Sequence, residues 1–261
     1  MQTVFDRAAV RRHRDRAAAT VGRVEPVLAE AAERLLERLD DTSRHFATAL
    51  DIGGRGIVAP LLRARGIATV SCDLSADMAA LSPQAVAADE EFLPFADASF
   101  DLVVASLALH WANDLPGALL LIRRALKPGG LFLGSVPLLG TLAELRTALT
   151  EAESALSGGI APRVSPFPAL SDCAGLLLRA GFALPVADAE EIRLLYADPL
   201  ALLRELRWAG EANAVAERER AIPPRELFAA ALAALPRQDG RTVATLRLGI
   251  LTGWNEATSP S

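Results

Sequence analysis

The chain has 261 residues, of which 51% are hydrophobic and 23% charged, with a formal net charge of −5. This balance is typical of a folded domain with a sizeable core and excludes a wholly disordered chain. The net negative charge provides no global field for nucleic acid, and no apolar run approaches the roughly 18 residues that span a bilayer. The two cysteines, Cys72 and Cys173, lie far apart, so neither a disulfide framework nor a cysteine metal site is expected.

The N-terminal segment predicts two helices, over residues 4–19 and 25–39, from apolar residues repeating at helical spacing. The first is rich in arginine, but Asp6 and Asp15 interrupt the basic run. A targeting peptide would usually lack acids, and the segment has no signal-peptide core. We therefore expect a mature helix in a cytoplasmic protein.

From residue 48 the chain alternates short apolar runs with amphipathic runs. Strands are predicted over residues 48–52, 68–73, 85–88, 100–106 and 131–136. Helices are predicted over residues 58–65, 76–81 and 115–126. This alternation specifies a parallel sheet with helices on both faces, and right-handed crossovers make the sheet doubly wound. The fold class is therefore α/β and Rossmann-like.

The rest of the chain departs from this alternation. It predicts helices over residues 141–155, 172–180 and, interrupted by two prolines, 200–234, with strands over residues 182–187 and 241–254. We interpret residues 1–254 as one domain: N-terminal helices or a lid (1–45), the cofactor-binding core (46–137), and substrate-side helices with the last strands (138–254). Residues 255–261 are expected to form a disordered tail.

The stretch LDIGGRG follows the first predicted strand, where a doubly wound sheet binds its ligand. Gly53, Gly54 and Gly56 let the backbone approach a ligand closely, and the next helix offers unpaired N–H groups. The spacing does not match the Gly-x-Gly-x-x-Gly of dinucleotide sites. S-adenosylmethionine is favoured instead, because Asp51 at the strand end suits a cationic sulfonium and ammonium.

Polar residues also follow the next three strands. Asp73 ends the second strand, where an acid can accept hydrogen bonds from both ribose hydroxyls. Asp89 follows the third and is placed to accept from an adenine amino group. The fourth ends at Ser106, and His110 and Trp111 are expected over the transferable methyl group. Asp73 could instead cap a helix and Asp89 could be a surface acid, but the order of these signals favours S-adenosylmethionine.

Several blocks of the sequence are similar to known families. LDIGGRG, ADEEFLPFADASFDLVVASLALHWANDLPGAL and LKPGGLFLGS resemble class I S-adenosylmethionine-dependent methyltransferases. Together with FDRAAVRRHRDRAA, GTLAELRTAL, GGIAPRVSPF, LLLRAGF and WAGEANA, they resemble the assembly-factor-5 family of respiratory complex I over residues 5–254. The malonyl-carrier-protein methyltransferases of biotin synthesis are a neighbouring group that shares FDRAA and the His–Trp region.

The resemblance implies a seven-stranded sheet with an antiparallel last strand, and S-adenosyl-L-methionine as cofactor. The candidate cofactor-binding residues are Asp51, Gly53, Gly54, Arg55, Gly56, Asp73, Leu74, Asp89, Glu90 and Ser106. The family's mitochondrial branch is associated with hydroxylating an arginine of a complex I subunit rather than methylating it, and fold does not fix chemistry. The expected partner is a complex I subunit as protein substrate, without nucleic acid or a transmembrane segment.

Three functions remain open. The leading one is an S-adenosylmethionine-dependent methyltransferase-type enzyme that modifies a protein. The second is a protein arginine hydroxylase on the same scaffold, and the third is a non-enzymatic assembly factor. The glycine loop motivates the third, because one residue of the usual Asp-x-Gly-x-Gly-x-Gly pattern is missing between Gly53 and Gly54. Arg55 could compensate by approaching the cofactor's carboxylate.

His110 is the candidate catalytic residue, because it is the only histidine near the expected site. It could act as a general base, or it could be a partly buried residue that orders the loop after the fourth strand. Trp111 is expected to form a pocket wall. The other histidines, His13 and His45, are distant in sequence, so no metal site is expected.

Charged residues outside the core have open roles. The arginines of the first helix could form a lid over the cofactor, bind an acidic partner or form a solvated face; they are Arg7, Arg11, Arg14 and Arg16. Arg163 and Glu211 lie in segments that are expected to cover the carboxyl edge of the sheet. These two are candidates for contact with the substrate.

Overall fold

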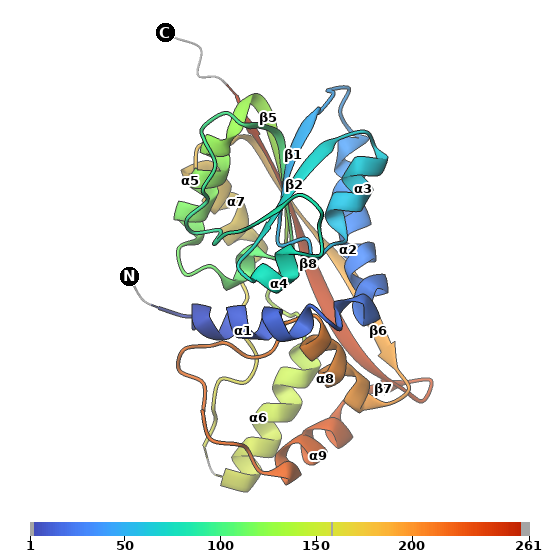
Figure 1. Cartoon of the computed structure of the whole chain (residues 1–261). Coiled ribbons are helices and arrows are strands. Elements are labelled where there is room, and N and C mark those ends of the chain that lie inside the picture. The colour runs from blue at the N-terminus through green and yellow to red at the C-terminus, as the bar shows by residue number, and fades with distance from the viewer. Residues whose placement is uncertain (1–2, 158, 257–261) are drawn as a thin grey trace.

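The structure, a computed structural model, describes residues 3–157 and 159–256. Within them, eight strands form one sheet in the order β3-β2-β1-β4-β5-β8-β6, with β7 paired to β8 (Figure 1). The strands are β1 (Thr48–Ile52), β2 (Ala68–Asp73), β3 (Ala85–Ala87), β4 (Phe100–Ser106), β5 (Leu126–Pro137), β6 (Ala183–Tyr196), β7 (Arg237–Gln238) and β8 (Arg241–Asn255).

Helices surround this sheet (Figure 1). The α-helices are α1 (Arg7–Ala17), α2 (Glu25–Leu36), α3 (Val58–Ala64), α4 (Ala76–Ala79), α5 (Leu115–Ala125), α6 (Ala143–Ser157), α7 (Leu170–Arg179), α8 (Pro199–Trp208) and α9 (Arg225–Ala234). Short 3-10 turns are η1 (Val21–Val24), η2 (Glu37–Leu39) and η3 (Leu109–Trp111). Among the residues described, no helix has the length and apolar character needed to cross a bilayer.

The strand directions confirm the predicted Rossmann-like sheet. β1, β2, β3, β4 and β5 pair in parallel, whereas β8 is antiparallel to both β5 and β6. The seven-strand order is therefore as expected, and the two-residue β7 adds an eighth strand beside β8. The chain crosses from β3 back past β1 to β4, which makes the carboxyl ends of β1 and β4 the switch point of the sheet.

The two faces of the sheet bury separate apolar clusters. Leu102 and Val104 of β4 pack with α2 and α3 on one face. Val103 and Ala105 of the same strand pack with α5 and α7 on the other. Successive side chains of a strand point to opposite faces, so a strand covered on both faces is apolar throughout. This is why 100–106 is recognisable as a central strand.

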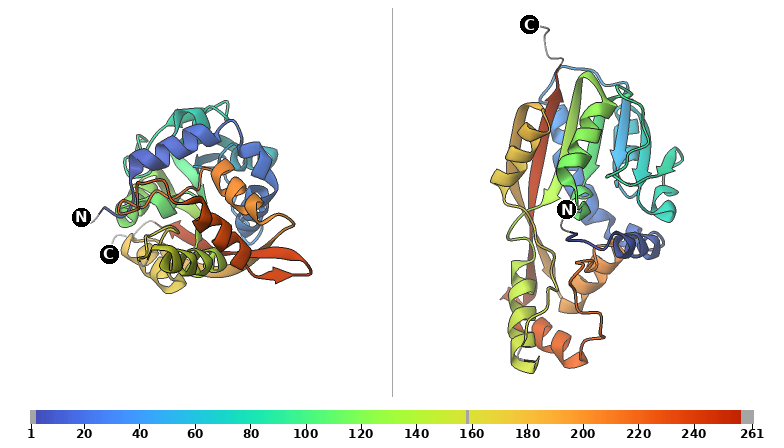
Figure 2. Two further views of the ribbon diagram at one scale, coloured as in Figure 1. Left: turned by 90° about the horizontal axis from the view of Figure 1, so that it is seen from below. Right: turned by 90° about the vertical axis from the view of Figure 1, so that its left-hand side faces the viewer.

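β6 and β8 extend beyond the other strands and carry a second layer of helices, α6, α8 and α9 (Figure 1). These helices share an apolar cluster that includes Leu145, Leu202 and Leu227. α1 lies between this layer and the carboxyl edge of the parallel strands, as Figures 1 and 2 show from different sides. The carboxyl edge of the parallel strands, with its switch point, therefore faces α1 and the layer of α6, α8 and α9.

Several predicted boundaries are wrong. β5 begins at Leu126 rather than 131, because Leu126 pairs with Phe100 before a register shift. β6 continues to Tyr196 rather than 187, because β8 pairs with it along this whole length. The acidic residues in this part of β6 are more typical of a loop. The predicted helical stretch 200–234 is two helices, since α8 ends before Gly210, whose φ of +80° favours glycine.

The predicted tail begins too early. Asn255 ends β8, and its Nδ2 donates to the Leu126 carbonyl at 2.8 Å. Residues 257–261, the rest of the predicted tail, lie outside the described residues.

Candidate functional site

The predicted cofactor residues meet at the carboxyl edge of the sheet. The amide of Gly53 donates to the carbonyl of Cys72 at 2.7 Å, which ties the glycine loop to the end of β2. The amide of Ala88 donates to the carbonyl of Asp73 at 2.9 Å, which ties the segment after β3 to the same place. Parallel strands bring their loops to one edge, so residues from four separate segments form one site.

Asp51 is a buried carboxyl at the end of β1, only 1% exposed. Ser71 Oγ donates to its Oδ2 at 3.2 Å, and its Oδ1 has no hydrogen-bond partner within the described chain. Burial, together with the nearby charge of Asp73, raises the pKa of Asp51 to about 7. A carboxylate desolvated in this way gains from a positive ligand beside it.

The shortened loop turns directly over Asp51. Gly53, Arg55 and Gly56 all have positive φ, of 64°, 52° and 77°. A Cβ on Gly54 would lie 2.1 Å from Oδ1 of Asp51, so only glycine fits there. The Asp51 carboxyl therefore packs directly against the loop backbone, in the space that a side chain at residue 54 would fill.

Arg55 points from this loop to a second polar cluster. Its guanidinium, 4% exposed as a residue, donates to the carbonyl of Leu107 at 2.9 Å and to Oε1 of Glu211. Burial lowers the pKa of Arg55, although the charge of Glu211 opposes that shift. These bonds direct the guanidinium toward Leu107 and Glu211. The contact between Arg55 and a cofactor carboxylate stays a prediction.

The carboxylate of Glu211 has three hydrogen-bond partners. Besides Arg55, it receives Trp111 Nε1 at 2.8 Å and lies 2.9 Å from His110 Nε2, both at Oε2. Burial alone would raise the pKa of Glu211, but its electrostatic and hydrogen-bond interactions with His110 and Arg55 outweigh burial and hold the pKa well below its ordinary value. The carboxylate is thus ionised and can only accept, so Nε2 of His110 donates to it.

The other nitrogen of His110, Nδ1, is buried and makes no hydrogen bond within the described chain. The side chain is 2% exposed. In the neutral imidazole, a proton on Nε2 leaves a lone pair on Nδ1. A carboxylate that orients a histidine is the arrangement of a general base. The role of His110 in catalysis stays a prediction, but the structure supplies the orienting partner that the sequence did not reveal.

α1 places two arginines against the acids of the site. Nη1 of Arg14 lies 2.7 Å from Oδ2 of Asp73, with both side chains buried. Arg7 donates to Oδ1 of Asp89 at 2.6 Å and pairs with Oε1 of Glu90 at 2.9 Å. The first helix therefore covers the acids with these two arginines, and a role as a lid over the cofactor stays a prediction.

The opposite side of α1 is a solvated face. Arg11 and Arg16 are exposed, as a solvated face requires. One helix thus has both an arginine face that pairs with acids and an arginine face exposed to solvent.

The acids keep capacity for a cofactor. Asp73 accepts from Ser75 N through Oδ1 and from Arg14 through Oδ2, one bond at each oxygen. Both hydrogen bonds to Asp89 fall on its Oδ1. A carboxylate has about four acceptor positions, so hydroxyl or amino donors of a ligand still find acceptors. Together with the unpaired oxygen of Asp51, these residues fit a cationic nucleotide such as S-adenosylmethionine.

The remaining predicted residues have structural partners. Ser106 is buried and accepts from Ser135 Oγ at 3.4 Å, and Leu74 packs on the apolar cluster under α1. Arg163 pairs with Glu153, with Nε 3.1 Å from Oε1. Their contacts with a cofactor or substrate stay predictions.

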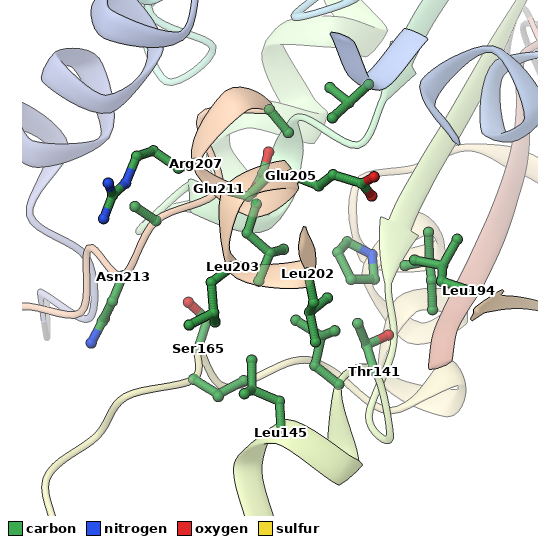
Figure 3. Close-up of a pocket in the computed structure, with 18 of the residues that line it drawn as sticks. Thr141, Leu145, Ser165, Leu194, Leu202, Leu203, Glu205, Arg207, Glu211 and Asn213 are labelled. Atoms are coloured by element: carbon green, nitrogen blue, oxygen red, sulfur yellow. The ribbon is translucent and has the colours of Figure 1, made fainter. Parts of the chain in front are cut away.

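A cavity of about 640 Å³ adjoins the His110–Glu211 pair. Its walls come from α2, α6, β6 and α8 and from the segment after β4. Figure 3 shows Leu145, Leu194, Leu202 and Leu203 around the space, with Arg207 and Asn213 at its margin. Among the described residues, no cluster of three His, Cys, Asp or Glu has metal-binding geometry.

The sequence of this chain is similar to those of known proteins. A family model described as a methyltransferase domain matches residues 50–134. The arginine-hydroxylase NDUFAF5, mitochondrial, of Danio rerio is 36% identical over 96% of this chain and 82% of its own. A malonyl-[acyl-carrier protein] O-methyltransferase of Laribacter hongkongensis is 35% identical over 98% of this chain and 91% of its own.

A solved structure shows the same fold. The YcgJ protein of Bacillus subtilis superposes with a TM-score of 0.59 at 16% identity, covering 86% of this chain and 99% of that one.

Proposed function

The chain belongs to the class I methyltransferase family that includes the NDUFAF5 arginine-hydroxylases and the malonyl-[acyl-carrier protein] O-methyltransferases, and on this premise we propose that it transfers a methyl group to an acceptor held at His110. S-adenosyl-L-methionine is the cofactor that the methyltransferase domain implies. When bound, it supplies an electrophilic methyl group. The acids and glycines of the carboxyl edge would hold it, with Asp51 beside its cationic end.

One observation carries the proposal: a carboxylate orients His110 while Nδ1 stays buried and unpartnered. Nδ1 would accept the proton of an acceptor hydroxyl or N–H. Bound S-adenosylmethionine would supply the methyl group, its carbon–sulfur bond breaking to leave a neutral thioether. Arg55 links this base to the glycine loop, because it donates to Glu211 and to the carbonyl of Leu107. The base and the cofactor loop are therefore joined through one side chain.

Arginine hydroxylation is a second candidate, and the names of the relatives favour it. It shares the scaffold but differs in product, since an oxygen atom rather than a methylene is added. In this alternative a complex I subunit is the expected substrate, and the protein serves complex I assembly. Mass spectrometry of that subunit from a deletion strain separates the two: loss of a methylene mass supports methylation, and loss of an oxygen mass supports hydroxylation.

Calorimetric titration of the full chain with S-adenosylmethionine tests cofactor binding. We expect saturable heat, and no heat at millimolar ligand would favour the non-enzymatic assembly factor instead. His110→Asn should keep this binding and lower methyl transfer by roughly 10²–10⁴-fold, the usual share of a general base. The matched control is His45→Asn, because His45 is exposed. Equal activity of the two variants would contradict the role of His110.

A further inference from the structure

We propose that the protein pairs with a second copy of itself through the outer edge of β6, in an antiparallel arrangement centred on Ile192. β6 is the last strand of the described sheet, and β8 lies beside it over its length (Figure 1). The other side of β6 has no strand partner within the described chain. The pairing is independent of the proposed function, because the residues that decide it lie outside the predicted cofactor site.

The open edge of β6 is long and continuous. The strand has 14 residues, and its ladder to β8 runs without a shift from Val186 to Tyr196. Apart from this ladder, its backbone groups bond to no other backbone group of the described residues. Natural edge strands are usually short or interrupted by proline and bulges, but here Pro185 and the register shift protect only the beginning. The rest is a template for a further strand.

The charges along this edge are complementary to themselves. In a two-fold pair, residue i of one chain contacts residue j of the other, and j contacts i. With Ile192 opposite its own copy, Glu191 of each chain lies opposite Arg193 of the other, and opposite charges in such positions are stabilising. Centring the pair on Glu190, Glu191 or Arg193 would instead place two like charges opposite each other, which is destabilising. The charges therefore select the register centred on Ile192.

Glu191 and Arg193 are both exposed and available for this contact. Arg247 faces Glu191 across β8, but it donates to the carbonyl of Leu139 at 3.2 Å and makes no ion pair with a described acid. Arg193 donates to Gln238 through Nη2 at 2.6 Å, which leaves Nη1 and Nε for a second chain. Exposed charge pairs contribute little affinity, so these two residues set the register and the choice of partner.

The same register covers an exposed apolar side chain. Leu195 is 46% exposed, and it would lie opposite the exposed Ala189 of the other chain. A large side chain opposite a small one fits without overlap, and burying its surface is favourable. Asp188 and Glu190 of this edge pair with arginines of α2, so their charges are compensated. Backbone hydrogen bonds, two charge contacts and two leucine contacts thus all agree on one symmetric arrangement.

Sedimentation equilibrium of the full chain, from low to high micromolar concentration, tests the pairing. We expect the average mass to rise from 27.6 kDa toward twice that value. Glu191→Arg and Arg193→Glu each place like charges opposite each other at both symmetric positions. Each change should therefore raise the dissociation constant of the dimer at least about tenfold.

Recombining the two changes should restore the dimer. A mixture of the Glu191→Arg and Arg193→Glu proteins opposes two arginines to two acids, so a mixed dimer should form although neither variant pairs with itself. A chain carrying both changes should dimerise as wild type. The matched control is Arg11→Glu, because Arg11 is exposed on α1 rather than on this edge, and it should also dimerise as wild type.

Three results would overturn the inference: a monomer at every concentration, a dimer that both charge reversals leave unchanged, or a mixture of the two variants that stays monomeric. The second would place the contact on another surface. Circular dichroism checks that each variant is folded. If a charge reversal unfolds the chain, Leu195→Asp takes its place, because it removes the apolar contact at both symmetric positions and should also weaken the dimer.

Discussion

Asp51→Asn should make the protein more stable and at the same time a poorer binder of S-adenosylmethionine. The pKa of Asp51 rises from 3.8 to about 7 through burial. A raised folded-state pKa means that the native protein holds a proton which the unfolded chain releases between about pH 4 and pH 7. Stability of the wild type therefore falls as pH rises through that window, by about 4 kcal/mol at 1.36 kcal/mol per pKa unit.

Asparagine is close to the shape of the neutral acid and cannot ionise, so it avoids this loss. Urea unfolding at about pH 5 and about pH 8 measures the difference in stability between this variant and the wild type. The dependence of the unfolding free energy on urea concentration should be the same for both proteins. Asp51→Asn should be more stable than the wild type at about pH 8. The difference in unfolding free energy between the two proteins should be smaller at about pH 5. In calorimetry it should lose at least tenfold in affinity, because an amide does not attract the cationic end of the cofactor.

Asp101→Asn is the matched control with the opposite sign. Burial would raise the pKa of Asp101, but hydrogen bonds from Lys127 and Thr48 outweigh it and lower the pKa. Stability from Asp101 is therefore present above its ordinary pKa and lost as pH falls, so this variant should be the less stable protein at about pH 8. A stability gap for Asp51→Asn that does not change with pH would refute the reasoning.

Three further changes test the buried contacts by thermal or urea unfolding. Glu211→Gln should cost about 3–5 kcal/mol, because a buried guanidinium loses its counter-ion; a loss below about 1 kcal/mol would contradict the pairing. Arg14→Met should cost a similar amount without cofactor, whereas Arg11→Met on the exposed side of the same helix should stay within about 0.5 kcal/mol. Gly54→Ala should cost about 1–3 kcal/mol through its clash, and Gly175→Ala, with nothing within 4 Å, should gain up to about 1 kcal/mol; equal effects would argue against the loop geometry.

Much of the cofactor edge was predictable because its signals are local. The strands Thr48–Ile52, Ala68–Asp73 and Phe100–Ser106 have the bounds that their apolar runs predict. Strand periodicity and turn chemistry act over a few residues, so a short window of sequence contains them. Since parallel strands end at one edge, the strand pattern alone places the residues that follow them together.

Contacts between distant segments were not predictable in the same way. Glu211 was singled out only as an acid near the substrate, and His110 had no visible partner. They pair across 101 residues of chain because α8 ends beside the segment after β4. The full length of β6 was missed for a similar reason, since its pairing with β8 rather than its own pattern makes it a strand.

The sequence by itself determined the doubly wound sheet, the glycine corner and the order of acids along its edge, because backbone conformation and side-chain alternation are properties of neighbouring residues. Only the tertiary structure decided which charges those acids meet. Arg14 reaches Asp73 across 59 residues, and Arg55 turns from the glycine loop to Glu211. A charge in the interior must find its partner wherever the packed chain brings one, and that place depends on the whole topology.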